Sequence, residues 1–459
     1  RSSDLKLIPR PFPCILCNEY RTIVRIERKV VAAEIRIAEL FAGVGGFRLG
    51  LDGYGKKGDD FYMEPAGPFH TVWANQWEPM GQESKQFAWR CYEKRFGEGS
   101  CVNEDIAKVL DEVDAGTRTI PEFDMLVGGF PCQDYSVAKP LALAAGIEGR
   151  KGVLWWSINR LLEMRLPKYV LLENVDRLLK SPASQRGRDF AIILCCLNRL
   201  GYNVEWHVVN AAEYGMPQRR RRVYIYAEHE GDWGNLEDRL RSTGVMARAF
   251  PIQPNEKDRG IYYPSLDGDP YEVTQNFGKG DKVSIFRNAG VMINGRIATM
   301  KVDAAYSGPH KTLGDVLVPA SEVPSQFWID ETKLESWRYL KGGKKEQRKA
   351  SSGYTYTYSE GPVAFPDSPD APSRTILTGE GGAGASRTKH VVEQDSRLRR
   401  LVPDELDQLQ MFPKGWTADG MTDGHRAFCM GNALVTDIPH RIGEVIAQDI
   451  NTKIGRAHV

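Results

Sequence analysis

Between residues 35 and 227, short apolar runs alternate with longer stretches in which apolar residues recur every three or four positions. The short runs predict strands, and the longer stretches predict amphipathic helices. Strands are expected in IRIAELFAG, FHTVWANQW, FDMLVGGF, YVLLENV, NVEWHVVNA and RRVYIYAE. Helices are expected in ESKQFAWRCYEKRFG, VLWWSINRLLEMR and DFAIILCCLNRLGY. This order predicts an α/β fold with a Rossmann-like, doubly wound, mostly parallel sheet that binds ligands at the carboxyl ends of its strands.

The pattern changes over residues 228–395, which lose the alternation and gain Gly, Pro, Ser and polar aromatics, as in SSGYTYTYSEGP. This composition predicts a second, irregular domain or a very large insertion. Regular patterning returns in LVPDELDQLQMFP, where Pro and Asp are typical of a helix N-terminus. We expect residues 396–450 to form a return segment whose last helix packs back on the first domain. The ends, 1–34 and 453–459, are expected to be non-native, since RSSDL and KIGRAHV resemble translated sequencing adapters.

Composition adds little to this picture and excludes some classes of protein. The 459 residues are 41% hydrophobic and 26% charged, with a net charge of +1, which is ordinary for a globular protein. No apolar run approaches the roughly 18 residues of a membrane span, and no secretory signal is visible, so we expect a cytoplasmic protein without a membrane partner. The eight cysteines are sparse and irregular, which predicts neither a disulfide framework nor a metal site.

A glycine-rich segment at residues 41–47, FAGVGGF, directly follows the first expected strand. Glycines there allow a sharp turn and close approach of a ligand. The spacing is not GxGxxG, which favours a nucleoside cofactor over a dinucleotide. An acidic residue after the second strand is expected to hold a ribose, and Glu78 lies near that position. Asp105 is placed to contact an adenine edge, although either carboxylate could be an ordinary surface group.

Cys132 lies in GGFPCQ, where the third strand ends, and Glu173 ends the next strand, YVLLENV. A cysteine at this edge can act as a thiolate nucleophile; the alternative is a small buried hydrophobe. Neighbouring strands lie about 4.7–4.9 Å apart, so both side chains can face one pocket. A carboxyl group beside a nucleophile can protonate or hydrogen-bond a substrate; the alternative is a capping or salt-bridged glutamate.

Four consecutive arginines, residues 219–222, precede the last expected strand. Alternation along an extended segment sends Arg220 and Arg222 to one side and Arg219 and Arg221 to the other. One pair can therefore enter the site while the other meets solvent or phosphate. The alternative is a solvated basic surface.

Taken in this order, the motifs resemble those of the DNA cytosine-5 methyltransferase family. The resemblance rests on FAGVGGF, GGFPCQ, ENV, QRRRRVYIYA, RRLVPDELDQLQMFP and GNALVTDIP, and it covers residues 35–227 and 397–447. It implies that residues 228–395 hold the target-recognition domain. It also implies S-adenosylmethionine as cofactor, no metal, duplex DNA as substrate and a monomer of prokaryotic or phage type. Three roles stay open: restriction-modification with a cognate restriction endonuclease, a solitary methylase, or a phage-borne enzyme. One departure concerns the family's ribose-binding acid, whose position is here Gln76; Glu78 is the expected replacement.

The resemblance further implies a role for individual residues. Cys132 would attack C6 of a cytosine swung out of the duplex, Glu173 would hydrogen-bond the ring, and Arg220 and Arg222 would support its carbonyl. Residues 133–152 would form a mobile loop over the flipped base. The expected cofactor contacts are Phe41, Gly43, Val44, Gly46, Trp77, Glu78, Asp105, Ile106, Pro131, Asn432 and Leu434. The expected DNA contacts are Gln133, Ser136, Arg387 and Lys389, the last two in a predicted reader segment at residues 375–392.

Three rival functions are compatible with parts of the sequence. A tRNA cytosine-5 methyltransferase shares the catalytic core but lacks a large recognition module. A DNA-binding protein with a decayed core would not be expected to keep Cys132, Glu173 and both inner arginines. A dinucleotide-dependent oxidoreductase is disfavoured by the glycine spacing.

Overall fold

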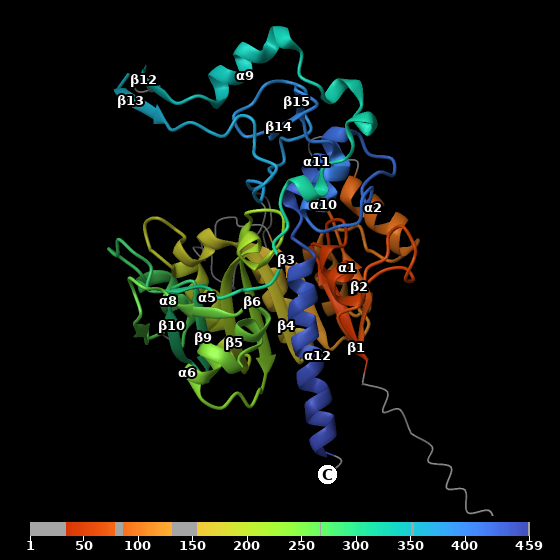
Figure 1. Ribbon diagram of the computed structural model, residues 1–459. Coiled ribbons are helices and arrows are strands. Elements are labelled where there is room, and N and C mark those ends of the chain that lie inside the picture. Colours follow the sequence, from red (N-terminus) through yellow and green to blue (C-terminus); the bar gives the residue numbers. More distant parts are fainter. Residues whose placement is uncertain (1–33, 79–85, 131–153, 267, 350–352, 458–459) are drawn as a thin grey trace, which may run out of the picture. The chain divides into compact units, whose positions relative to one another are not determined.

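The computed structural model describes residues 34–457 except 79–85, 131–153, 267 and 350–352 (Figure 1). Its centre is a nine-stranded sheet in the order β2-β1-β3-β4-β6-β5-β9-β10-β8. The first four of these strands are mutually parallel. They are β1 (Ile35–Leu40), β2 (Phe69–Asn75), β3 (Met125–Gly129) and β4 (Tyr169–Val175).

Helices cover both faces of this sheet, which explains why its strands are nearly continuous apolar runs. Successive residues of a strand point to opposite faces: Leu126 and Leu172 belong to one core cluster, whereas Val127 and Leu171 belong to another. The helices α3 (Ile106–Asp114), α4 (Leu154–Arg165) and α5 (Arg188–Arg199) contribute to the first cluster. The helices α1 (Gly46–Asp52) and α12 (Asp437–Ala457) contribute to the second. The predicted α/β, doubly wound class is therefore confirmed.

The sixth strand along the chain runs antiparallel to its neighbours, unlike the strands of a purely parallel sheet. Strand β6 (Arg221–His229) lies antiparallel between β4 and β5 (Tyr202–Asn210). Only residues 211–220 connect β5 to β6, and their one element is the single turn η3 (Ala211–Tyr214). A parallel neighbour needs a crossover of a dozen or more residues, so this short link imposes the antiparallel pairing.

The sheet continues beyond residue 227. Strands β9 (Ala289–Ile293) and β10 (Arg296–Met300) form a hairpin beside β5, and β8 (Ile261–Tyr262) closes that edge. The link is Asn294-Gly295, and both residues have positive φ, 49° and 76°, as a two-residue hairpin turn requires. The nearby smaller elements are α6 (Leu236–Asp238), α7 (Val245–Ala249), α8 (Pro270–Asn276) and the pair β7 (Ile252–Pro254) and β11 (Val302–Ala304).

The rest of the predicted recognition region is irregular, as its composition indicates. It contains short 3-10 turns, α9 (Leu334–Lys341) and two hairpins. One hairpin joins β12 (Lys344–Lys349) to β13 (Thr355–Glu360), and the other joins β14 (Val391–Gln394) to β15 (Arg397–Arg400). The domain boundaries remain predictions.

After β15 the chain forms α10 (Pro403–Leu409) and α11 (Asp423–Asn432) and then enters α12. Helix α12 packs on α1 so closely that a Cβ at Gly50 would lie 2.6 Å from the Thr436 carbonyl oxygen. Its apolar side chains Ile438 and Ile442 join the core beneath β1. The last turns continue past residue 450 to Ala457. Within the described ranges, no helix is both long and apolar enough to cross a membrane.

Candidate active site

The carboxyl ends of β3 and β4 bring together the two segments that the sequence singled out. Gly129 pairs directly with Glu173 across the two strands. A Cβ at Gly129 would lie 3.3 Å from Glu173 Oε2, so a glycine here leaves room for the carboxyl group. Cys132 follows three residues later and, with Pro131, Gln133 and Ser136, lies outside the described residues.

The Glu173 carboxyl group is buried, with 9% of the residue exposed. Burial raises its pKa, while the nearby charges of Arg222 and Arg220 oppose the shift. Arg222 Nε lies 2.9 Å from Glu173 Oε1. The two residues come from adjacent strands, because Glu173 pairs with Tyr224 and Arg222 lies two positions along on the same face. This glutamate can therefore keep a proton to higher pH than a surface glutamate does, and it is fixed in orientation.

Arg220 and Tyr224 surround the same carboxyl group. Arg220 is 1% exposed, and the one described hydrogen bond of its side chain runs from Nη2 to the Gly431 carbonyl oxygen at 3.1 Å. Its Nε and Nη1, and the Tyr224 hydroxyl, are buried without a hydrogen-bond partner among the described residues. Burial lowers the pKa of Arg220 to about 9 and raises that of Tyr224 well above its usual value. Buried donors rarely stay unpaired, so this cluster is suited to receive polar atoms of a ligand.

The alternation predicted for the four arginines is present. Arg220 is buried and the Arg222 side chain is 18% exposed, whereas Arg219 is exposed and the Arg221 side chain is 56% exposed. The inner pair meets Glu173, and Arg221 lies 3.5 Å from Asp176.

Asn174 is a residue to which sequence reasoning assigned no role of its own. Its Nδ2 donates to the Phe130 carbonyl oxygen at 2.8 Å, and its Oδ1 accepts from the Val175 amide at 2.8 Å. It is 1% exposed. The side chain therefore fixes the backbone two residues before Cys132, from the neighbouring strand. The signal was visible as the polar pair Glu173-Asn174 in an otherwise apolar strand.

The glycine-rich turn after β1 adopts the conformations that its sequence predicts. Phe41, Gly43 and Gly45 all have positive φ, at 56°, 56° and 87°. A Cβ at Gly45 would lie 2.3 Å from the Phe96 ring, so the position accepts only glycine. At Gly43 a Cβ would meet nothing closer than 4.0 Å, which leaves open space beside the turn. The Val44 carbonyl oxygen accepts from Trp416 Nε1 at 2.9 Å.

Gln76 occupies the position of the family's ribose-binding acid and holds the turn itself. Its Oε1 accepts from the Gly43 amide at 2.8 Å, and it is 7% exposed. The side chain of Gln86 forms two hydrogen bonds with the backbone of Glu78: it accepts from the Glu78 amide and donates to the Glu78 carbonyl oxygen. Trp77, between them, is partly buried. A ribose role for Glu78 remains a prediction.

Two further segments reach the same end of the sheet. Asp105 caps α3 by accepting from the Ala107 amide at 2.9 Å, as an acidic residue before a helix commonly does. Ile106 beside it is 3% exposed. From the far end of the chain, Leu434 packs so closely on the turn that a Cβ at Gly46 would lie 3.1 Å from its Cγ. Asn432, at the end of α11, is exposed.

These residues fit a nucleoside cofactor. The open turn at Gly43 and the ends of β1, β2 and β3 lie side by side in the sheet, which is where α/β folds bind nucleotides. No group of three or more His, Cys, Asp or Glu side chains in the described chain is arranged to hold a metal ion.

The two residues expected to read DNA bases are engaged inside the protein. Lys389 is 7% exposed, and its Nζ donates to the carbonyl oxygens of Gly382 and Gly384 at 2.5 and 2.7 Å. Arg387 Nη1 lies 3.1 Å from Glu360 Oε2. In this conformation both side chains organise loops, and their contact with DNA remains a prediction.

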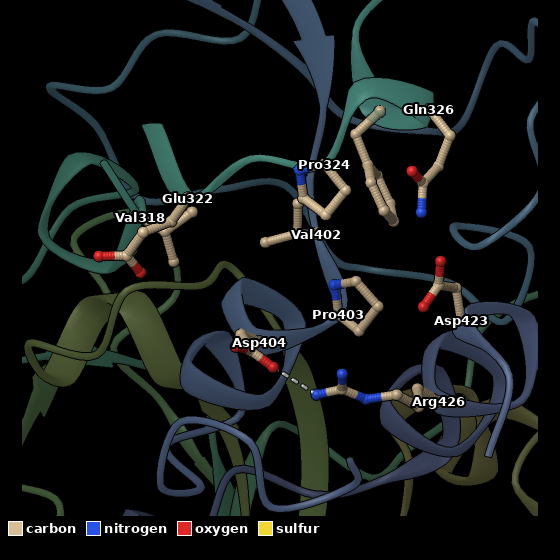
Figure 2. Close-up of a pocket in the computed structure, with 10 residues that line it drawn as sticks. Val318, Glu322, Pro324, Gln326, Val402, Pro403, Asp404, Asp423 and Arg426 are labelled. Carbon is tan, nitrogen blue, oxygen red and sulfur yellow. Dashed lines mark hydrogen bonds and ion pairs between the residues drawn. The ribbon is translucent and has the colours of Figure 1, made fainter. Parts of the chain in front are cut away.

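A pocket of about 140 Å³ lies elsewhere, at the start of α10 and α11 (Figure 2). Figure 2 shows Arg426 pointing toward Asp404, and the two ends are 2.6 Å apart. Arg426 also donates to the buried Asp407 at 2.9 Å. No predicted catalytic or cofactor residue lines this pocket. Three of its four charged side chains, those of Glu322, Asp404 and Arg426, form ion pairs within the protein.

Comparison with known proteins agrees with this geometry. Residues 35–448 match the family described as C-5 cytosine-specific DNA methylase. The chain is 44% identical over 420 residues to type II methyltransferase M.Sau3AI of Staphylococcus aureus, covering 90% of this chain and 95% of that protein. It is 34% identical over 416 residues to type II methyltransferase M.Bsp6I of Bacillus sp. (strain RFL6), covering 90% and 98%.

Among solved structures, the crystal structure of the S. pombe Dnmt2 methyltransferase is similar, with a TM-score of 0.53 and 15% identity over 91% of this chain and 100% of that one. This likeness concerns the fold. The family match begins at β1 and ends within α12, and so includes every element that builds the site. The chain therefore belongs to the C-5 cytosine-specific DNA methylases and is a DNA cytosine-5-methyltransferase.

Proposed function

We propose that this enzyme methylates C5 of a cytosine flipped out of a specific duplex DNA sequence, through a covalent adduct between Cys132 and C6 of the ring. The observation that carries the proposal is the buried Glu173 carboxyl group. Glu173 lies directly opposite Gly129, and Gly129 belongs to the strand that leads to Cys132. Arg222 orients the Glu173 carboxyl group. A nucleophile and a proton-holding group at adjacent strand ends are what addition to a cytosine ring requires.

Each residue of the cluster has a distinct role in this proposal. The Cys132 thiolate adds to C6, and the electron pair moves into the ring toward C5. Glu173, whose pKa is raised by burial, hydrogen-bonds the ring at N3 and the exocyclic amine, either protonated or sharing a proton, and so disperses negative charge. Arg222 and Arg220 support the ring carbonyl. The Nε and Nη1 of Arg220 have no hydrogen-bond partner among the described residues, and in this proposal they serve as donors. After methylation, loss of the C5 proton and of the thiolate releases the product.

S-adenosylmethionine would supply the electrophilic methyl group. In this chain the turn from Phe41 to Gly46 would lie along it, with Gln76 holding that turn open. Trp77, Glu78, Asp105, Ile106, Pro131, Asn432 and Leu434 would complete the pocket. We also propose a restriction-modification role with a cognate endonuclease, because the two relatives compared above are named type II methyltransferases, and a monomer as the working form.

The test is trapping on duplex DNA that contains 5-fluorocytosine, with S-adenosylmethionine present. Fluorine at C5 blocks the final elimination, so the wild-type protein should run as a denaturant-resistant adduct with DNA. Cys132→Ala should give no adduct. Cys196→Ala is the matched control, because that thiol is buried on α5 and burial raises its pKa to about 12.

Each alternative outcome has a definite meaning. An adduct that persists in Cys132→Ala would assign the nucleophile elsewhere. An adduct on tRNA and not on DNA of varied sequence would move the substrate to RNA. No adduct on either would indicate a binding protein with an inactive core.

A further inference from the structure

The hairpin β12–β13 is a two-stranded sheet that pairs with no other described strand (Figure 1). Its register pairs Lys344 with Glu360 at one end and Lys349 with Thr355 at the other. Because directly opposed residues share a face, the ribbon has two distinct faces. The two differ sharply in charge and in exposure.

One face is internally neutralised. Lys344 lies 3.8 Å from Glu360, and Arg348 lies 3.3 Å from Glu346. The Arg348 guanidinium also stacks 3.6 Å from the Tyr358 ring centre. Tyr339 of α9 donates to Glu346 at 3.1 Å and covers this face. Two basic and two acidic side chains therefore cancel, and most of the face is partly buried.

The other face, which we call the outer face, carries no carboxylate and no apolar side chain. Every one of its residues is exposed. Among the described residues, the one side-chain hydrogen bond across this face runs from Gln347 Nε2 to Thr357 Oγ1 at 2.9 Å. The outer face consists of Lys345, Gln347, Lys349, Thr355, Thr357 and Ser359.

Arg387 fixes the base of the ribbon. Its Nη1 donates to the Gly342 carbonyl oxygen, just before β12, at 3.3 Å, and lies 3.1 Å from Glu360 at the end of β13. Its Nη2 donates to the Gly361 carbonyl oxygen. The arginine thus holds both strand ends to the segment that follows residue 385. It is a positioning residue, and the ribbon that it positions presents the exposed side chains of Lys345, Gln347 and Lys349.

We infer that the outer face contacts duplex DNA, with Lys345 and Lys349 on phosphates and Gln347 at a base edge in the major groove. A groove about 12 Å wide admits a two-stranded ribbon. Lysines on phosphates give affinity and register, whereas a glutamine amide can read a base. A protein partner fits poorly, because interface cores are rich in aromatic residues and poor in lysine. The inference rests on the proposed DNA substrate and identifies a surface of the protein that binds it.

The experiment uses the full chain and a duplex carrying its own target, found by bisulfite sequencing of plasmid DNA from cells that express the wild-type protein. Binding to this duplex and to an unrelated one is measured by fluorescence anisotropy at several salt concentrations. The variants are Lys345→Ala/Lys349→Ala and Gln347→Ala. The matched control is Lys56→Ala/Lys57→Ala, which removes the same charge from an exposed turn of the catalytic domain. Thermal unfolding should be unchanged in all of them.

The double variant should bind both duplexes about 10-fold or more weakly near physiological salt, and the slope of log affinity against log salt should fall by about two. Gln347→Ala should weaken binding to the target about 5- to 100-fold more than to the unrelated duplex. A double variant with wild-type affinity and slope, or one no weaker than the control, would overturn the inference. A uniform loss in Gln347→Ala would overturn the base-edge assignment. Failure of the wild-type protein to methylate any site would instead reject the proposed function.

Discussion

The strand-end cluster around Glu173 and the hairpin β12–β13 both depend on charge, but they use it under opposite conditions. In the cluster, Glu173 and Arg220 are buried, and burial shifts the pKa of each. On the outer face of the hairpin, Lys345 and Lys349 are exposed. Buried charge interacts strongly and in a fixed geometry, as chemistry requires. Exposed charge is screened and adaptable, as reversible contact with a polyanion requires.

The largest expected effect comes from the cluster. Glu173→Gln keeps the shape of the side chain but removes its proton-holding function, so single-turnover methyl transfer should fall by about 10²- to 10⁴-fold. Affinity for DNA should stay within a few-fold of wild type, because the hairpin is untouched. Transfer of a labelled methyl group measures the rate of methylation, and fluorescence anisotropy measures the affinity for DNA. Glu98→Gln, at an exposed position, is the control. Full activity in Glu173→Gln would mean that the Glu173 carboxyl group takes no part in the reaction.

Arg222 should come next, through its effect on Glu173. Arg222→Met removes a positive charge that lowers the pKa of Glu173. Methyl transfer should fall by about 10- to 100-fold, and the high-pH limb of kcat/KM should move to higher pH, because the carboxyl group then keeps its proton longer. Arg222→Lys retains the charge and should leave the limb near its wild-type position. A limb that stays fixed in Arg222→Met would mean that another group controls it.

Arg387 is relevant to DNA binding in two ways, because it is predicted to contact DNA and it holds the base of the hairpin. Arg387→Met should loosen β12–β13, speed hydrogen exchange of its backbone amides and weaken DNA binding by about 5- to 10-fold. Methyl transfer at saturating DNA should be unchanged. Arg338→Met, on the exposed side of α9, serves as the control. Unchanged exchange together with weaker binding would favour a direct base contact by Arg387.

The smallest effect concerns a buried carboxyl group of β1. Tyr92 donates to Glu39 at 2.9 Å, and burial raises the pKa of Glu39 to about 8. The folded state therefore holds this proton more tightly than the unfolded chain, so the free energy of unfolding should fall as pH rises from about 4.5 to about 8. In Glu39→Gln the slope should flatten in denaturant titrations across that window. An unchanged slope would assign it to other groups.

Local patterns were sufficient for the secondary structure and for much of the site. Short apolar runs predicted the parallel strands, and the helical spacing of apolar residues predicted several of the helices. Alternation along an extended segment separated Arg220 and Arg222 from Arg219 and Arg221. The positive φ angles at Gly43 and Gly45 are conformations that glycine, unlike residues with a Cβ, adopts without steric cost. These features depend on residues close together in the chain, so the sequence determines them directly.

Other features depend on partners that are distant in sequence. The extension of the sheet by β9, β10 and β8 needs an edge of β5 some eighty residues earlier, as in the Glu205–Val291 pair. Gln76 holds the turn only because β1 and β2 are neighbours, and Asn174 holds Phe130 only because β3 and β4 are.

Lys389 and Arg387 illustrate the same limit most clearly. In the sequence alone they are two basic residues in a glycine-rich segment, which is typical of a segment that contacts DNA. Within the protein, the lysine donates to the carbonyl oxygens of residues 382 and 384. The arginine donates to those of residues 340, 342 and 361 and forms an ion pair with Glu360. The sequence by itself determined which residues can carry charge and where strands end. Only the tertiary structure decided which charges are buried, paired or left facing solvent, because desolvation and pairing depend on what packs against a side chain.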